Sequence, residues 1–296
     1  MLSAVQAPRG SPRPARAPPR DLDQAPSQLG YGCNPRKSWL SLSLSATTFT
    51  ASFCQVSMPL HNVTIDDVSA LIGYHNPNGL PWKDSPSNDT SLGSYSDQTY
   101  HSSNQTGARS TFRFQGTAVY LFAATRWMHG KYDIFMDDQL AYQGNGHTKS
   151  SIFNQLVFNA TSLSAGWHNL TFVNTDPGLY IEVDYISWTT VMPAALVESS
   201  GIPISHTLGN MAYDVSLWEG GESSSSPYIV TGTNGAEVNI TFKGNGIELY
   251  GRTGPDYGVF SAQVDNYDSH ELDAYSGRVH NTILVNLHCL YKRSQN

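Results

Sequence analysis

The fold is decided by one stretch, Gly107-Ala-Arg-Ser-Thr-Phe-Arg-Phe-Gln-Gly116, which recurs 128 residues later as Gly235-Ala-Glu-Val-Asn-Ile-Thr-Phe-Lys-Gly244. The match runs without a gap from Tyr100–Asp137 to Tyr228–Asp265, and nine of these 38 positions are identical. Ordinary composition would give about two or three identities. The period is far longer than that of a solenoid repeat, so the pattern indicates a duplicated domain.

The repeated segment predicts strands separated by turns. Phe112 and Phe114 alternate with polar neighbours, as in a strand with one buried face. A short apolar run at 118–124, answered at 246–251, predicts a central strand. Alternating segments at 168–174 and 181–188 continue the first copy, whereas 156–163 could be a strand or a short helical turn. Many short strands without a long helical period predict an all-β sandwich or jelly roll.

We therefore expect an all-β chain with two tandem jelly-roll (β-sandwich) domains, at 58–195 and 200–296. The second is predicted to be incomplete, because the sequence ends before any counterpart of Gly166–Trp188. A sheet without its closing strands leaves open edges, so this copy is expected to be marginally stable.

Residues 1–57 are predicted to be a tail. Its first 37 residues are rich in Pro and Arg and cannot bury a core, which predicts disorder. A signal-like segment follows, in which Arg36 and Lys37 precede the moderately apolar Trp39–Phe53. An ordinary strand or linker is the alternative interpretation.

Charge and hydropathy exclude two classes of partner. Only 14% of residues are charged, the net charge is −7, and many basic residues lie in the tail. The predicted domains contain no basic stripe, so no nucleic-acid partner is expected. No run of 18 apolar residues exists, so no membrane-spanning helix is predicted.

Asparagine sequons favour secretion, with chance composition as the alternative. The six acceptors are Asn62, Asn88, Asn104, Asn159, Asn169 and Asn239. Cys33, Cys54 and Cys289 lie outside the repeated segments. Cys33 and Cys54 could pair in an oxidising compartment or stay unpaired, and the absence of C-x-x-C excludes a zinc ribbon or thioredoxin motif. We expect an extracellular or cell-surface location.

The candidate ligand-binding residues centre on the loop Thr125-Arg-Trp-Met-His-Gly130. Trp127 could stack on the apolar face of a sugar while Arg126 and His129 donate to hydroxyls. Tyr257 keeps one aromatic residue in the second copy, and Trp82 lies in a polar loop. For Trp127 and Trp82, packing within the fold is the alternative role.

No catalytic motif is present, so we expect no enzyme activity. The sequence has no G-x-S-x-G, H-E-x-x-H or Walker A motif. Asp66, Asp67, Asp137, Asp138 and Asp184 could suggest paired acids or calcium. No calcium-loop motif supports a metal, and sequence spacing cannot establish a carboxylate pair. We expect no cofactor and no metal, with structural calcium as the alternative.

The first copy resembles modules of secreted and membrane-anchored proteins of mushroom-forming (basidiomycete) fungi. These are galactose-binding-domain-like jelly rolls, found in tandem ahead of a membrane span. The resemblance covers about 60–192 and part of 205–277, and it implies no catalytic residues. Each of its motifs is degenerate, so their order carries the resemblance. It rests on Asn62-Val-Thr-Ile-Asp-Asp67, Asp84-Ser-Pro-Ser87, Ser94-Tyr-Ser, Thr99-Tyr-His101, Gly107–Gly116, His129-Gly-Lys-Tyr132, Gly166-Trp-His-Asn-Leu170 and Ile181–Trp188.

The sequence departs from this pattern, since the closing strands of the second copy and the membrane span are both missing. That fits a gene model that ends early. The leading functional hypothesis is a non-catalytic extracellular recognition module for a glycan or cell-wall polysaccharide. The alternatives are the ectodomain of a membrane-anchored surface receptor and the accessory region of a glycoside hydrolase.

Overall fold

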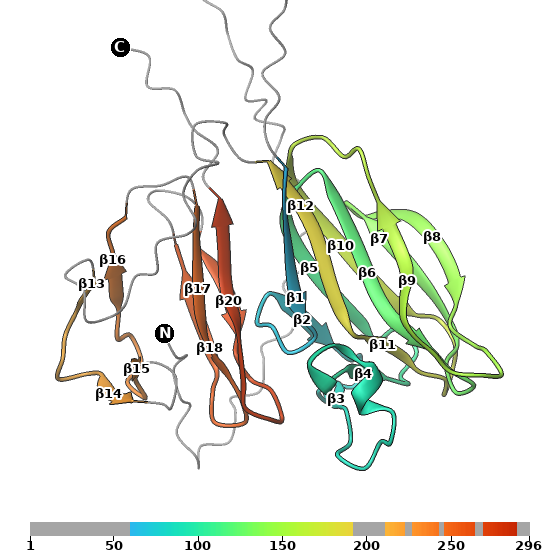
Figure 1. The fold of residues 1–296 in the computed structure, drawn as a ribbon, viewed down its shortest axis with the longest axis horizontal. Helices are drawn as coiled ribbons and strands as arrows, with labels where there is room; N and C mark the ends of the chain where they lie inside the picture. The colour runs from blue at the N-terminus through green and yellow to red at the C-terminus, as the bar shows by residue number, and fades with distance from the viewer. Residues whose placement is uncertain (1–59, 192–210, 223–226, 243–245, 264–268, 289–296) are drawn as a thin grey trace, which may run out of the picture. The chain divides into compact units, whose positions relative to one another are not determined.

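A computed structural model describes residues 60–191, 211–222, 227–242, 246–263 and 269–288 (Figure 1). We call 60–191 the first module and the later ranges the second module. The helical segments in these ranges are two short 3-10 turns, η1 (Leu92–Ser94) and η2 (Ser96–Gln98), and no helix there could cross a membrane. The predicted all-β class is confirmed. The tail 1–57 and all three cysteines lie outside the described residues.

The first module is a sandwich of antiparallel sheets (Figure 1). The four-stranded sheet has the order β1 (Leu60–Asp66), β12 (Tyr185–Val191), β6 (Ala118–Thr125), β9 (Ile152–Ala160). The five-stranded sheet has the order β2 (Ile72–His75), β5 (Arg109–Gly116), β10 (Gly166–Asn174), β7 (Lys131–Met136), β8 (Gln139–Asn145). A small sheet joins β11 (Ile181–Val183), β4 (His101–Ser103) and β3 (Lys83–Asp84).

The core lies between the two large sheets. Phe112 and Phe114 point into it from β5, as their alternation predicted, and they meet Val119 and Leu121 from the apolar run. Trp188 is 3% exposed and packs edge-on against Phe112. These inward positions alternate with more exposed ones along β5 and β10, as expected for strands with one face on the core.

Two predictions about strands are refined by the structure. The ambiguous segment 156–163 belongs mainly to β9, because it pairs with β6. The alternating segment 181–188 is not one strand: β11 and β12 belong to different sheets, and all three residues of β11 are buried. Glu182 therefore lies inside the protein although the alternation suggested an exposed position.

The second module consists of antiparallel strand pairs in the described ranges. The pairs are β13 (Met211–Tyr213) with β16 (Val238–Ile240), β14 (Glu219–Glu222) with β15 (Pro227–Val230), β17 (Gly246–Thr253) with β20 (His280–His288), and β18 (Val259–Ala262) with β19 (His270–Asp273). In the first module, β10 lies between β5 and β7, and β12 lies beside β6. The described second module has no strand at either place, which leaves its sheets two-stranded.

The 128-residue spacing recurs in the backbone itself. The strand β17 begins and ends 128 residues after β6, and β20 begins and ends 128 residues after β9. Thr125 pairs with Ile152, and Thr253 pairs with His280. Corresponding strands therefore pair in corresponding register, well beyond the segment in which the sequences match.

Candidate functional site

The loop after β6 is held by a frame of backbone hydrogen bonds. Arg126 N donates to Gly146 O at 3.0 Å, and Gly146 N donates to Gly130 O at 2.9 Å. Tyr180 N donates to Met128 O at 2.9 Å, and Gly130 N returns a bond to Tyr180 O at 3.0 Å. The loop is thus tied to two separate segments, which fixes its path without any ligand.

The same frame recurs in the second module. Gly254 N donates to Ala274 O at 3.0 Å, and Ala274 N donates to Gly258 O at 3.1 Å. Each donor and acceptor lies 128 residues after its counterpart in the first module. Tyr257 takes the place of His129, and it packs against the core of its own module while partly buried. The frame is therefore shared, but its side chains are not.

Arg126 turns away from solvent and binds Asp89. Its Nη1 lies 2.8 Å from Asp89 Oδ2, and the two side chains are only 12% and 10% exposed. Nη1 also donates to the Tyr95 hydroxyl at 3.2 Å. Burial by itself would raise the pKa of Asp89, but hydrogen bonds, the first of them from Arg126, hold that pKa at about 2. Arg126 therefore anchors the loop rather than offering its charge to a ligand.

His129 is also directed inward. Its Nδ1 lies 3.0 Å from Ala124 O and its Nε2 lies 3.1 Å from Glu182 Oε2, with the two side chains 4% and 1% exposed. Because a carbonyl oxygen can only accept, Nδ1 donates to Ala124. Glu182 Oε1 accepts from the Tyr95 hydroxyl at 2.9 Å and from Ala124 N at 2.8 Å. The interpretation of Arg126 and His129 as donors to sugar hydroxyls does not fit these contacts.

Trp127 is the residue of this loop that faces solvent. It is 65% exposed, although its neighbours on both sides are anchored. Its carbonyl oxygen accepts from His147 Nδ1 at 2.8 Å, and His147 N is held in turn by Asn145 Oδ1 at 2.9 Å. The indole is therefore presented from a backbone that is fixed on both sides.

Trp82 and Tyr257 do not join Trp127 at a common surface. Trp82 is 4% exposed, its indole N–H donates to His75 O at 3.2 Å, and its ring lies 4.9 Å from that of Tyr74. A ring in this position has no free face for a sugar. The sequence placed Trp82 in a polar loop, but the structure places it in the core.

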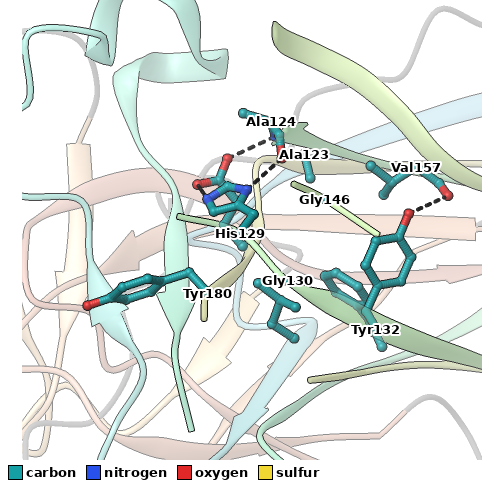
Figure 2. A pocket seen from close by; sticks show the side chains of 11 residues that line it. Ala123, Ala124, His129, Gly130, Tyr132, Gly146, Val157 and Tyr180 are labelled. Atoms are coloured by element: carbon teal, nitrogen blue, oxygen red, sulfur yellow. Dashed lines mark hydrogen bonds and ion pairs between the residues drawn. The ribbon is translucent and has the colours of Figure 1, made fainter. Parts of the chain in front are cut away.

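A small pocket lies next to the buried end of the loop (Figure 2). Figure 2 shows His129 beside Ala124, and the Tyr132 hydroxyl directed at Val157, whose carbonyl oxygen accepts at 3.3 Å. Glu182 also lines the pocket and is bound to His129. Since the polar groups of the wall bond to one another, the exposed loop is the better candidate surface for a ligand.

A second buried polar cluster surrounds His101. Nδ1 lies 2.5 Å from Asp67 Oδ2, and Nε2 lies 3.0 Å from Asp84 Oδ1. Burial lowers the pKa of His101, but the bonds to Asp67 and Asp84 outweigh it and raise the pKa to about 9. The Tyr74 ring stacks on the imidazole at 4.7 Å. Imidazolium and carboxylates thus form one internal ion network.

Asp66 and Asp184 extend this cluster. Burial raises the pKa of Asp66 to about 9, with a further contribution from Asp67, and burial raises the pKa of Asp184 to about 7. Asp66 therefore carries a proton at neutral pH. In the described part of the chain, no group of three or more His, Cys, Asp or Glu side chains is arranged to hold a metal ion.

Sequence reasoning missed Asp89, His101 and Glu182. The available signal was charge inside an apolar pattern, as in Ile181-Glu-Val-Asp184, because a buried charge must find a partner. The partners lie far away in sequence, so the pattern could indicate a buried network but not its members.

Comparisons with known proteins give a partial picture. No protein-family model matches the chain. A curated relative, "A type blood alpha-D-galactosamine galactosaminidase" of Flavonifractor plautii, is 25% identical over 167 residues. That match covers 55% of this chain and 15% of the relative.

Two solved structures illustrate the structural similarity. The first, the CBM36-1 domain of a xylanase from the hindgut metagenome of Trinervitermes trinervoides, has 10% identity and a TM-score of 0.29, with 48% of this chain and 100% of that chain covered. The second, a family two carbohydrate esterase from Cellvibrio japonicus, has 11% identity and a TM-score of 0.28, with 50% and 37% covered. Superpositions at this level do not establish a shared function.

Proposed function

We propose that this chain is a non-catalytic extracellular recognition protein whose first module binds carbohydrate through Trp127. One observation carries the proposal: Trp127 is 65% exposed, whereas Arg126 and His129 beside it are locked into the interior. An aromatic face can stack on the apolar side of a sugar ring. Because the loop is already ordered, little conformational entropy is lost when a ligand binds.

The second module does not share this site in the proposal. At the positions matching Trp127 and His129 it has Pro255 and the half-buried Tyr257. Its loop has the same backbone frame but no exposed indole. We therefore assign one sugar-binding site to the chain, and the partner is a glycan or cell-wall polysaccharide rather than nucleic acid.

An extracellular location is supported by the sequons. Asn62, Asn88, Asn159 and Asn239 are exposed, and Asn104 and Asn169 are partly exposed. An oligosaccharide attached at any of them would not have to enter the core.

The test is binding of the full chain to a glycan array, followed by titration with the best ligand. Trp127→Ala is expected to weaken binding about tenfold or more, as loss of a central aromatic contact does. Trp167→Ala is the matched control, because Trp167 is also exposed, at 42%, but lies on a sheet face stacked with Arg113 at 4.7 Å. Retention of full affinity by Trp127→Ala would remove the site, and absence of any ligand would remove the function.

A second candidate, the accessory region of a glycoside hydrolase, is favoured by the sequence match to part of a galactosaminidase. Incubation of the full chain with labelled glycans separates it from hydrolysis by the chain itself. Binding without release of product is the outcome expected of an accessory region, and turnover would show a catalytic protein.

A further inference from the structure

The outer face of the four-stranded sheet carries an apolar row. Phe122 pairs with Tyr185 on one side and with Leu156 on the other, so the three residues cross β12, β6 and β9. The rings of Phe122 and Tyr185 stack at 4.3 Å and 11°, and Leu156 is 49% exposed. Tyr120 lies two residues before Phe122 on the same face and is also partly exposed. A row of this kind on a solvent-facing sheet calls for an occupant.

A glycosylation sequon lies directly beside this row. Asn159, in the sequence Asn159-Ala-Thr161, is exposed on the edge strand β9 and pairs with Tyr120 on β6. Residues that face each other across antiparallel strands point to the same side, with Cβ atoms about 5 Å apart. The Asn159 amide and the Tyr120 ring are therefore neighbours on the outer face.

The same cross-strand line continues with hydroxyl groups. Tyr120 pairs with Ser187 on β12, and Ser187 pairs with Thr64 on β1. The hydroxyls of Thr64 and Ser187 lie 2.6 Å apart on this face. Adjacent strands are about 4.8 Å apart. A chain that starts at Asn159 thus passes first over an aromatic ring and then over hydroxyls.

We propose that Asn159 is N-glycosylated and that the first sugars of its glycan pack on this face, with the Tyr120 ring as the platform. In the modification, Asn159 Nδ2 loses a proton and bonds to the anomeric carbon of the terminal N-acetylglucosamine of a lipid-linked oligosaccharide. The bond from that carbon to the lipid pyrophosphate breaks, and the lipid pyrophosphate leaves. The apolar ring face of the sugar then covers Tyr120, and its polar groups reach Ser187 and Thr64.

A covalently attached sugar is the occupant that the page favours over a free partner. Its tether keeps it at a high effective concentration beside the row, so weak stacking is enough to hold it. The interaction is distinct from ligand binding at Trp127, and it does not depend on that function.

The chain offers two control sequons. Asn239 on β16 is exposed like Asn159, but the residue that it faces is Ala212. Asn62 on β1 belongs to the same sheet as Asn159 and faces Thr189. Neither has an aromatic ring opposite it, so neither glycan should be held in the same way.

The experiment directs the full chain through the secretory pathway of a eukaryotic host with an added leader. Site occupancy and the rate of glycan removal from the native protein by an endoglycosidase are then measured by peptide mass spectrometry. We expect Asn159 to be occupied and its glycan to be released at least several-fold more slowly than that at Asn239. Tyr120→Ala should abolish the difference, and Tyr120→Phe, which keeps the ring face, should preserve it.

The Asn62 glycan monitors folding in the same sheet. If Tyr120→Ala accelerates release at Asn159 but not at Asn62, the platform is supported. An empty Asn159 would overturn the proposal. So would release at Asn159 that Tyr120→Ala leaves unchanged, or that it accelerates equally at Asn62 because the sheet has opened.

Discussion

Nε2 of His129 lies 3.1 Å from Oε2 of Glu182, and both side chains are almost completely buried. This pair lies beneath the loop that presents Trp127 to solvent. Glu182 also binds Tyr95 and the backbone of Ala124, and Tyr95 in turn binds Arg126. The loop that looked like a set of sugar-binding donors is therefore one exposed indole on a buried ionic support.

Replacing Glu182 tests this support. Glu182→Ala leaves the Tyr95 hydroxyl, Ala124 N and His129 without their acceptor, and we expect a loss of about 3–5 kcal/mol in the free energy of unfolding. Denaturant titration followed by tryptophan fluorescence measures it. Asp133→Ala is the control, since Asp133 accepts only an exposed bond from Gln143 and should change stability by less than about 0.5 kcal/mol. Equal small effects of the two variants would contradict the buried support.

The His101 cluster should make the first module less stable as the pH rises from about 6 to about 9. Bonds to Asp67 and Asp84 raise the pKa of His101 to about 9 against the opposing effect of burial. Burial raises the pKa of Asp66 to about 9 and that of Asp184 to about 7. The folded state therefore keeps protons that the unfolded chain releases, so stability falls with increasing pH, by about 2–4 kcal/mol.

Asp66→Asn isolates part of this dependence. An amide resembles the protonated carboxyl, so the variant should match the wild type near pH 6 and lose less stability than the wild type by pH 9. Thermal denaturation between these pH values provides the comparison. A wild-type protein that gains stability over this range would show that the cluster holds no extra protons.

Two glycines that face each other across β5 and β10 should differ in their tolerance of a side chain. A Cβ on Gly116 would overlap the carbonyl of Thr189, whereas a Cβ on Gly166 would meet nothing within 4 Å. We expect Gly116→Ala to cost about 2–4 kcal/mol and Gly166→Ala less than about 1 kcal/mol. Denaturation of the two variants in parallel checks this, and similar costs would argue against the close approach of β5 to β12.

Much of the strand pattern could be predicted from the sequence, because it depends on local periodicity. The alternation at Phe112 and Phe114 and the apolar run at 118–124 correspond to β5 and β6. The recurrence of Gly116 as Gly244 reflects a turn between two strands, and the repeat in sequence is matched by a repeat in strand register.

The directions of the site side chains could not be predicted in this way. His129 turns inward because Glu182, 53 residues later, supplies a buried carboxylate. Trp82 enters the core because the backbone of His75 accepts its indole N–H. Both depend on tertiary contacts, whereas Trp127 remains exposed because no segment covers it.

The second module should open more readily than the first. The strand β6 pairs with both β12 and β9, whereas β17, its counterpart, pairs only with β20 in the described residues. Strands with fewer partners exchange their amide hydrogens through lower-energy openings. Hydrogen exchange on the full chain should show faster exchange in β17 and β20 than in β6 and β9. Equal protection would contradict the expected marginal stability.

The most direct test of the central claim is the dissociation constant for the best glycan ligand, measured for the wild type, Trp127→Ala and Trp167→Ala. The account predicts that Trp127→Ala raises Kd about tenfold or more while Trp167→Ala leaves it unchanged. Equal affinity of all three proteins, or loss of affinity only in Trp167→Ala, would contradict the assignment of the binding surface to the Trp127 loop.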